Sequence, residues 1–437
     1  MLKAPFSSEF DPSEESEGSI DPLGLQPAYE RLADRMLPAV TVRMGRPRFV
    51  TAMALGACIC EGWDADAVSS DGVTPPWLVY EWIVVEAFVR AANVLDNPYG
   101  TPGIQKVGRA IRSQRPVSAS AYLKTPMVFG FSGVFRRLAR EIGILTEDGR
   151  LDDGGYELLA AWAKDQGLDG IIDASAGTGY AFRERLRRAI SQGLEKGHTT
   201  GQPKEFWNEI ARRLDPSQSG RNEARLLLSR ILSRAGPEEM VKQLKDALIA
   251  QGGVRDRADE APFLRGLGRH AQDALKELLT GIDAYEAFGR AITDAFDALR
   301  YCGSINGAAP VGADDFATMP VTKRALKALG PAISRVQKHP MLLEWERDHD
   351  LPEALQHFEA VRNGVDLFEA LRDHHEQVQK NKPPNGKRAW FEHARADKIV
   401  IRAGYSVTSP PDGQGTYVHE YRIPTFSGFL ADLGALR

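Results

Sequence analysis

DAYEAFGRAITDAFDALRY, residues 283–301, repeats apolar side chains at every third or fourth position. That spacing gathers them on one side of a helix, so the stretch predicts an amphipathic helix. Comparable helical segments are predicted at 180–195, 203–214, 220–235, 237–251, 261–280, 320–338, 340–349 and 352–379. Breakers such as DPSQSG and AQGGVRD separate them, and no fixed period relates them. We therefore expect a mainly α, multi-helix protein rather than a regular solenoid.

Composition divides the 437 residues into five expected segments. They are a disordered acidic tail (1–24), an N-terminal helical segment (25–97), a basic segment (98–167), a helical body (168–380) and a C-terminal segment (381–437). In the last of these, KIVIRAGYSV and GTYVHEYRI alternate β-branched and aromatic residues on either side of TSPPDGQG. This pattern predicts a small β hairpin at the C-terminus.

Charge and cysteine content limit the classes of protein to which this sequence can belong. The net charge is −4, but residues 1–22 hold six acids and one Lys, so the rest of the chain is close to +1. This tail is too polar to fold alone, and it either stays disordered or occupies the protein's own basic groove. The most apolar run, WLVYEWIVVEAFV (77–89), is too short to span a bilayer and carries Glu81 and Glu86. Three cysteines and no signal pattern lead us to expect a cytoplasmic protein.

The basic segment carries the most information about function. Between Asn97 and Arg140 there is no Asp or Glu, while eight Lys and Arg side chains occur. GIQKVGRAIRSQ, SASAYL and GFSGVFRRLAREIGIL predict three helices, and TEDGRLDDGG predicts a turn, a short strand and another turn before a closing helix.

This order resembles the winged helix-turn-helix family over about residues 103–167. The resemblance implies a third helix that enters the major groove, ending at Gly143 to Leu145, and a wing that carries Arg150. It also implies that Tyr156, Leu158 and Leu159 begin a core-facing helix. Arg and Lys suit such a surface because each phosphate contact releases counterions and Arg can clasp guanine through two hydrogen bonds. The expected DNA-binding residues are Lys106, Arg109, Arg112, Arg115, Ser118, Ser120, Tyr122, Lys124, Thr125, Ser132, Arg136, Arg137, Arg140 and Arg150.

Three classes of function follow. The leading one is non-catalytic binding of double-stranded DNA, as a subunit of a bacterial DNA-transaction or genome-defence assembly, with a protein partner or a second copy of the chain. An interaction scaffold that docks an enzyme partner is the alternative. A metal-dependent nuclease is the third, because Asp412, Glu420 and Arg422 are similar to the PD-(D/E)xK pattern with Arg in place of Lys.

Other motifs predict no cofactor and no metal. DASAGTGYAF (173–182) resembles a Walker loop or a methyltransferase motif, but Tyr180 follows its last glycine where a phosphate loop needs Lys, so a loop and helix cap are expected. His349, His357, His374 and His375 lack ligand spacing and are expected on polar surfaces. Two further basic runs, at 181–190 and 322–339, are expected to be solvated helix faces or an extension of the nucleic-acid path.

Overall fold

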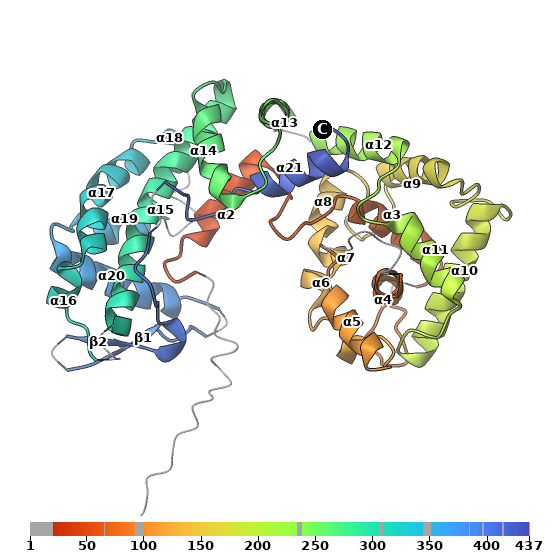
Figure 1. Ribbon diagram of the computed structural model, residues 1–437, viewed down its shortest axis with the longest axis horizontal. Coiled ribbons are helices and arrows are strands. Elements are labelled where there is room, and N and C mark those ends of the chain that lie inside the picture. The colour runs from red at the N-terminus through yellow and green to blue at the C-terminus, as the bar shows by residue number, and fades with distance from the viewer. Residues whose placement is uncertain are drawn as a thin grey trace, which may run out of the picture. The chain divides into compact units, whose positions relative to one another are not determined.

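The computed structural model describes residues 21–64, 66–91, 100–233, 238–305, 309–343, 351–383, 385–395, 397–412 and 415–436. The expectation of a mainly α protein with a small C-terminal two-stranded sheet is confirmed (Figure 1). The chain divides into two compact units. Unit 1 contains Ala258–Tyr421 together with the chain up to Arg35, and unit 2 contains Met36–Arg257 together with Arg422–Arg437. Most of the expected acidic tail, and the expected boundary at 97, lie outside the described residues.

The described residues of unit 2 form helices joined by turns and loops, together with isolated bridges. Its longer helices are α3 (Phe49–Cys60), α4 (Pro76–Arg90), α5 (Ile104–Arg112), α9 (Asp153–Gln166), α10 (Thr178–Lys196), α11 (Lys204–Leu214), α12 (Arg221–Leu232), α13 (Glu238–Gln251) and α21 (Ile423–Asp432). Helix α4 is its centre and packs against α3, α5, α10 and α11. Twelve of its fifteen residues are buried, which explains why the most apolar run of the sequence is a core helix. No helix in the part of the chain that the structure describes has the length and apolar character to cross a membrane.

Two acids hold helices together inside unit 2. The guanidinium of Arg48 lies 3.0 Å from Glu223 Oε1, with both side chains almost fully buried, and it also donates to the carbonyl oxygen of Arg213. Asp165 on α9 accepts hydrogen bonds from the backbone N–H groups of Asn222 and Glu223 at the start of α12. A carboxylate placed there satisfies helix N–H groups that have no intrahelical partner.

The segment expected to form three helices folds into shorter pieces. After α5 comes the single turn η1 (Ala119–Ala121), followed by α6 (Pro126–Phe129), α7 (Phe131–Val134) and α8 (Arg136–Glu141). The continuous third helix expected over 130–145 is therefore wrong. The interruption falls at Phe135, between α7 and α8. A Cβ on Gly133 would lie 2.4 Å from the Met127 backbone, so this glycine permits α7 to pack closely on α6. Leu145 and Leu151 form an isolated antiparallel bridge around the turn 146–150, and α9 follows.

Helix α15 (Asp273–Ile305) organises unit 1 and packs mainly against α17 (Pro320–Gln337). The sequence predicted a break near 281–282, but Gly281 lies inside the helix. A Cβ there would lie 2.4 Å from Met341 Cε, so this glycine permits close packing instead of ending the helix. The remaining helices of unit 1 are α2 (Gln26–Met36, which ends at the unit boundary), α14 (Arg257–Gly268), α16 (Ala313–Ala317), α18 (Pro340–Leu343), α19 (Leu351–Glu359) and α20 (Gly364–Lys380).

The C-terminal sheet pairs differently from expectation. Strand β1 (Phe391–His393) pairs antiparallel with β2 (Ile399–Ile401), so the first predicted strand is present but has another partner. Residues 415–422 form no strand, and buried Glu286 of α15 contacts them. Glu286 accepts hydrogen bonds from the backbone N–H groups of Val418 and His419, and also from His419 Nδ1 at 2.7 Å and the Tyr421 hydroxyl at 2.9 Å. A side chain distant in sequence thus satisfies two backbone N–H groups that a strand ladder would otherwise use.

Candidate nucleic-acid interface

Helix α5 separates a buried apolar side from an exposed basic side. Val107, Gly108 and Ala110 are buried, and α5 packs on α4. Lys106, Arg109 and Arg112 are exposed. The helix begins after Gly103, whose φ of 79° is left-handed and whose Cα lies against the Tyr122 ring. A Cβ at Gly103 would lie 2.4 Å from that ring, so only glycine allows the start of α5 to approach it so closely.

The chain after α5 adds two more cations. Backbone pairing between Val117 and Thr199 anchors it to the end of α10. Arg115 and Lys124 are exposed, as are the hydroxyl residues Ser120 and Thr125, and Ser118 is half-buried, with its Oγ 3.1 Å from Ser120 Oγ. We call Lys106, Arg109, Arg112, Arg115 and Lys124 the basic surface. None of them forms an ion pair with any residue that the structure describes.

Tyr122 and Ser132 do not belong to that surface. Tyr122 is only 3% exposed, and its hydroxyl donates to Glu81 Oε1 at 2.7 Å. The Ser132 backbone N–H donates to Glu81 Oε2 at 2.9 Å. Burial raises the pKa of Glu81, and these two hydrogen bonds oppose that shift. The expectation that Tyr122 contacts phosphate is wrong, because the side chain is buried and its hydroxyl forms the hydrogen bond that attaches the 122–132 segment to α4.

The arginines expected on the third helix and wing have different surroundings. Arg140 Nη1 lies 3.1 Å from Glu147 Oε2, and Arg150 Nε lies 3.0 Å from Asp148 Oδ2. Arg136 forms no ion pair among the described residues, and its nearest hydrogen-bond partner is Met127 Sδ at 4.0 Å. Arg137 is exposed. Acids within the turn 146–150 thus partly neutralise this end of the segment. Leu158 and Leu159 are buried as expected, whereas Tyr156 is 38% exposed.

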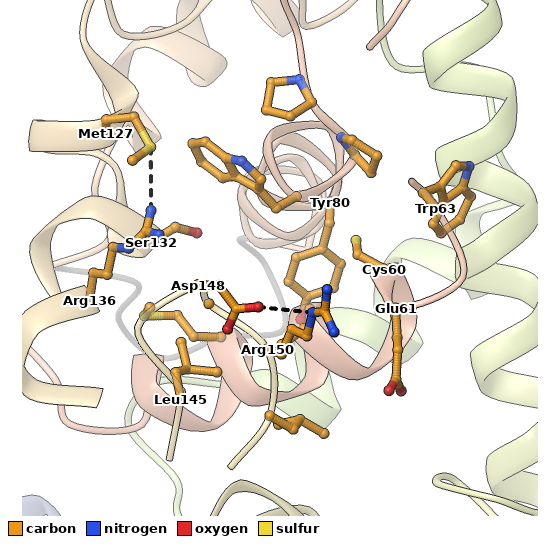
Figure 2. Close-up of a pocket in the computed structure, with 18 of the residues that line it drawn as sticks. Cys60, Glu61, Trp63, Tyr80, Met127, Ser132, Arg136, Leu145, Asp148 and Arg150 are labelled. Atoms are coloured by element: carbon orange, nitrogen blue, oxygen red, sulfur yellow. Dashed lines mark hydrogen bonds and ion pairs between the residues drawn. The ribbon is translucent and has the colours of Figure 1, made fainter. Parts of the chain in front are cut away.

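A cavity of about 710 Å³ lies beside these arginines, and the sequence did not reveal it. Its walls come from α3, the start of α4, α6 to α8 and the turn 146–150 (Figure 2). The Tyr80 ring lines the cavity but is only 1% exposed, and its hydroxyl donates a 2.8 Å hydrogen bond to the Ala52 carbonyl (Figure 2). Gly56 makes room for that ring, since a Cβ there would lie 2.7 Å from it.

Aromatic and charged side chains line the cavity in different places. Trp63 and Trp77 join Tyr80 as aromatic walls. Glu61 lies on the Trp63 side, while Arg136 lies on the opposite side next to Met127 (Figure 2). Asp64 also lines the cavity. Five separate stretches of sequence supply this lining, so no single motif could have indicated it. The Trp-rich runs CICEGW and PPWLVYEW are the only local signal.

The other sequence candidates have structural roles. The 173–182 stretch is a loop followed by α10, as expected, and Arg183 donates to the carbonyl oxygens of Ala174 within it and of Ile171 just before it. His374 and His375 were expected on the surface but are buried, 3% and 0% exposed. Each meets a backbone carbonyl of residues 22–23, so they attach that segment to α20.

The nuclease residues show no metal-binding arrangement. Asp412 is exposed and Glu420 is half-buried, with its carbonyl accepting from the Tyr29 hydroxyl. Within the described ranges, no group of three or more His, Cys, Asp or Glu side chains is placed to hold a metal ion.

Comparisons with known proteins add no identification. No family model, no curated protein and no solved structure matches this chain. The functional argument therefore depends on the chain's own side chains.

Proposed function

We propose that this protein binds double-stranded DNA, non-catalytically, through the basic surface of unit 2. One observation carries the proposal: five exposed cations occupy α5 and the chain after it, and none is paired with an acid of the described residues. Solvated helix faces usually mix both signs of charge, whereas a surface that follows a phosphate backbone needs one sign.

The proposed contacts are mainly with phosphates. Lys106, Arg109 and Arg112 lie on successive turns of one helix side, which suits a row of phosphates. Ser120 and Thr125 add uncharged donors. Because phosphate contacts carry no direct sequence information, we expect little sequence preference from this surface alone.

The test is fluorescence anisotropy of a labelled duplex at several salt concentrations. Five phosphate contacts predict a slope of about −4.5 for log K against log salt. Reversing Lys106, Arg109 and Arg112 to Glu removes three contacts and adds repulsion, so affinity near 0.1 M salt falls on the order of 100-fold.

A matched control reverses three exposed cations on α9 and α12, namely Lys164, Arg221 and Arg225. It changes the net charge equally and leaves the affinity nearly unchanged. If both variants lose the same affinity, the binding depends on net charge and not on the basic surface, and the proposal is wrong.

An interaction scaffold is the competing function, and one observation favours it. Met127, Val128 and Phe129 of α6 are 48%, 44% and 48% exposed, which is unusual for three consecutive apolar residues. A scaffold predicts no salt-sensitive DNA binding and no effect of the α5 reversals. The same titration therefore separates the two functions.

A further inference from the structure

We infer that the cavity of unit 2 receives an unstacked nucleobase, either from a DNA strand or from a free nucleotide. The inference that the base comes from a DNA strand rests on the proposed function, whereas the inference that the cavity binds a free nucleotide does not. The volume of about 710 Å³ lies within the range of small-molecule sites, roughly 300–1,000 Å³.

The walls suit a flat aromatic ring. Trp63 and Trp77 supply aromatic walls of the cavity. The Tyr80 ring packs beside them but is only 1% exposed. Figure 2 shows Trp63 and Tyr80. Trp77 and Trp63 are half-buried, so part of each ring remains open to a ligand. Base stacking on such side chains is favourable and tolerates any base, because every base has a π face.

The charges on opposite sides of the cavity suit the rest of a nucleotide. Arg136 is half-buried and lacks a carboxylate within ion-pair distance among the described residues, so it can accept a phosphate at low cost. Burial and the nearby Arg140 lower the pKa of Arg136, as expected for a guanidinium without a close counter-ion. Glu61, on the other side, and Asp64, which also lines the cavity, can accept hydrogen bonds from the exocyclic amino groups of bases.

Other ligand classes fit less well. An apolar ligand would cover Arg136 without giving it an acceptor, and a buried unpaired charge is costly. A cation would find Glu61 and Asp64 but would lie in the same cavity as Arg136 and Arg150. A nucleotide offers a phosphate to Arg136 and amino-group donors to Glu61 and Asp64.

The cavity is close to the basic surface along the chain. Met127 lines the cavity, and Lys124 precedes it by three residues, so their Cα atoms are at most about 11 Å apart. A strand whose phosphates follow the basic surface can therefore deliver a base to the cavity without a large detour.

The experiment compares two labelled duplexes that differ only in one unpaired adenine in the centre. The wild-type chain is expected to bind the bulged duplex about tenfold more tightly than the paired one. Ala57→Phe places a ring in the cavity from α3 and removes this preference, while affinity for the paired duplex stays within about twofold. Ala160→Phe, the same change at an exposed site on α9, keeps the preference.

Trp77→Ala removes one wall without filling the cavity, and it also loses the preference if it folds with the wild-type circular dichroism spectrum. If the wild type binds both duplexes equally, or if Ala57→Phe keeps the preference, the inference that the cavity receives a base from a DNA strand is wrong.

A third arm titrates adenosine monophosphate while tryptophan emission is followed. Saturable quenching in the wild type that is lost in Ala57→Phe supports the cavity as a nucleotide site. If the same chain binds neither duplex, the proposed DNA binding is wrong, but the cavity remains a site for a free nucleotide. Absence of both duplex preference and nucleotide quenching overturns the inference.

Discussion

Buried polar side chains, each with a defined partner, set the local geometry in both units. Glu81 attaches the 122–132 segment to α4, and Glu286 attaches residues 418–421 to α15. His375 does the same for the N-terminal segment: its Nδ1 donates to the Pro22 carbonyl at 2.8 Å, and its Nε2 accepts from the Trp390 backbone N–H at 2.9 Å. These partners require the neutral ring, because a proton on Nε2 would remove the acceptor.

Unit 1 is expected to lose stability in mild acid through His375. Burial is the main cause that lowers the pKa of this imidazole from 6.5 to about 4. The unfolded chain therefore binds a proton that the folded chain does not between these values, and stability falls as pH drops from about 6.5 toward 4. The shift corresponds to about 3 kcal/mol.

Urea unfolding at pH 7.5 and pH 5 measures this effect. His375→Phe lowers the stability at pH 7.5, because the Pro22 carbonyl and the Trp390 N–H lose their partner, but it flattens the dependence on pH. An unchanged slope in the variant would assign the acid sensitivity to other groups.

At the scale of elements, apolar spacing predicted helices well and predicted their ends poorly. The single helix expected over 352–379 is two helices, α19 and α20, separated by residues 360–363. Asn363 causes the restart: its side chain accepts from the backbone N–H groups of Val365 and Asp366 at 2.8 and 3.0 Å. Asn is a favoured N-cap residue, so the sequence alone could have predicted this helix start. The apolar spacing continues across residues 360–363, and it led to the prediction of a single helix.

Asn363→Ala is expected to destabilise unit 1 by about 1 kcal/mol, because the first turn of α20 loses its cap. Thermal or urea unfolding measures the loss. Asn363→Asp keeps an acceptor at the same position and should stay within a few tenths of a kcal/mol of the wild type. A similar loss in both variants would show that the Asn363 amide nitrogen, which donates to Asp366, is what matters.

At the scale of the whole molecule, the two units differ in the surfaces they offer. The basic surface and the cavity both lie within unit 2. Unit 1 carries its own basic run on α17, where Lys323, Arg324 and Lys327 are exposed. Arg324 there donates to the Pro411 carbonyl, and Arg335 is paired with Asp283, so this run is partly engaged in structure.

We expect DNA affinity to reside in unit 2. Reversing Lys323, Arg324 and Lys327 to Glu should change the dissociation constant by no more than about twofold at 0.15 M salt, because we place the phosphate contacts on the five cations of the basic surface. The α5 reversal in the same titration is the positive comparison. A loss as large as that of the α5 variant would extend the nucleic-acid surface to α17.

The sequence by itself determined the mainly helical fold, the acid-free stretch from 97 to 140 and the exposure of its α5 cations, since these depend on local spacing and composition. Only the tertiary structure decided that Tyr122 is buried, that the third helix is broken and that an aromatic cavity lies behind the turn 146–150. The physical reason is separation along the chain. Glu81 and Tyr122 are 41 residues apart, and the cavity walls combine stretches from 53 to 151, so their contacts arise from packing and not from local pattern.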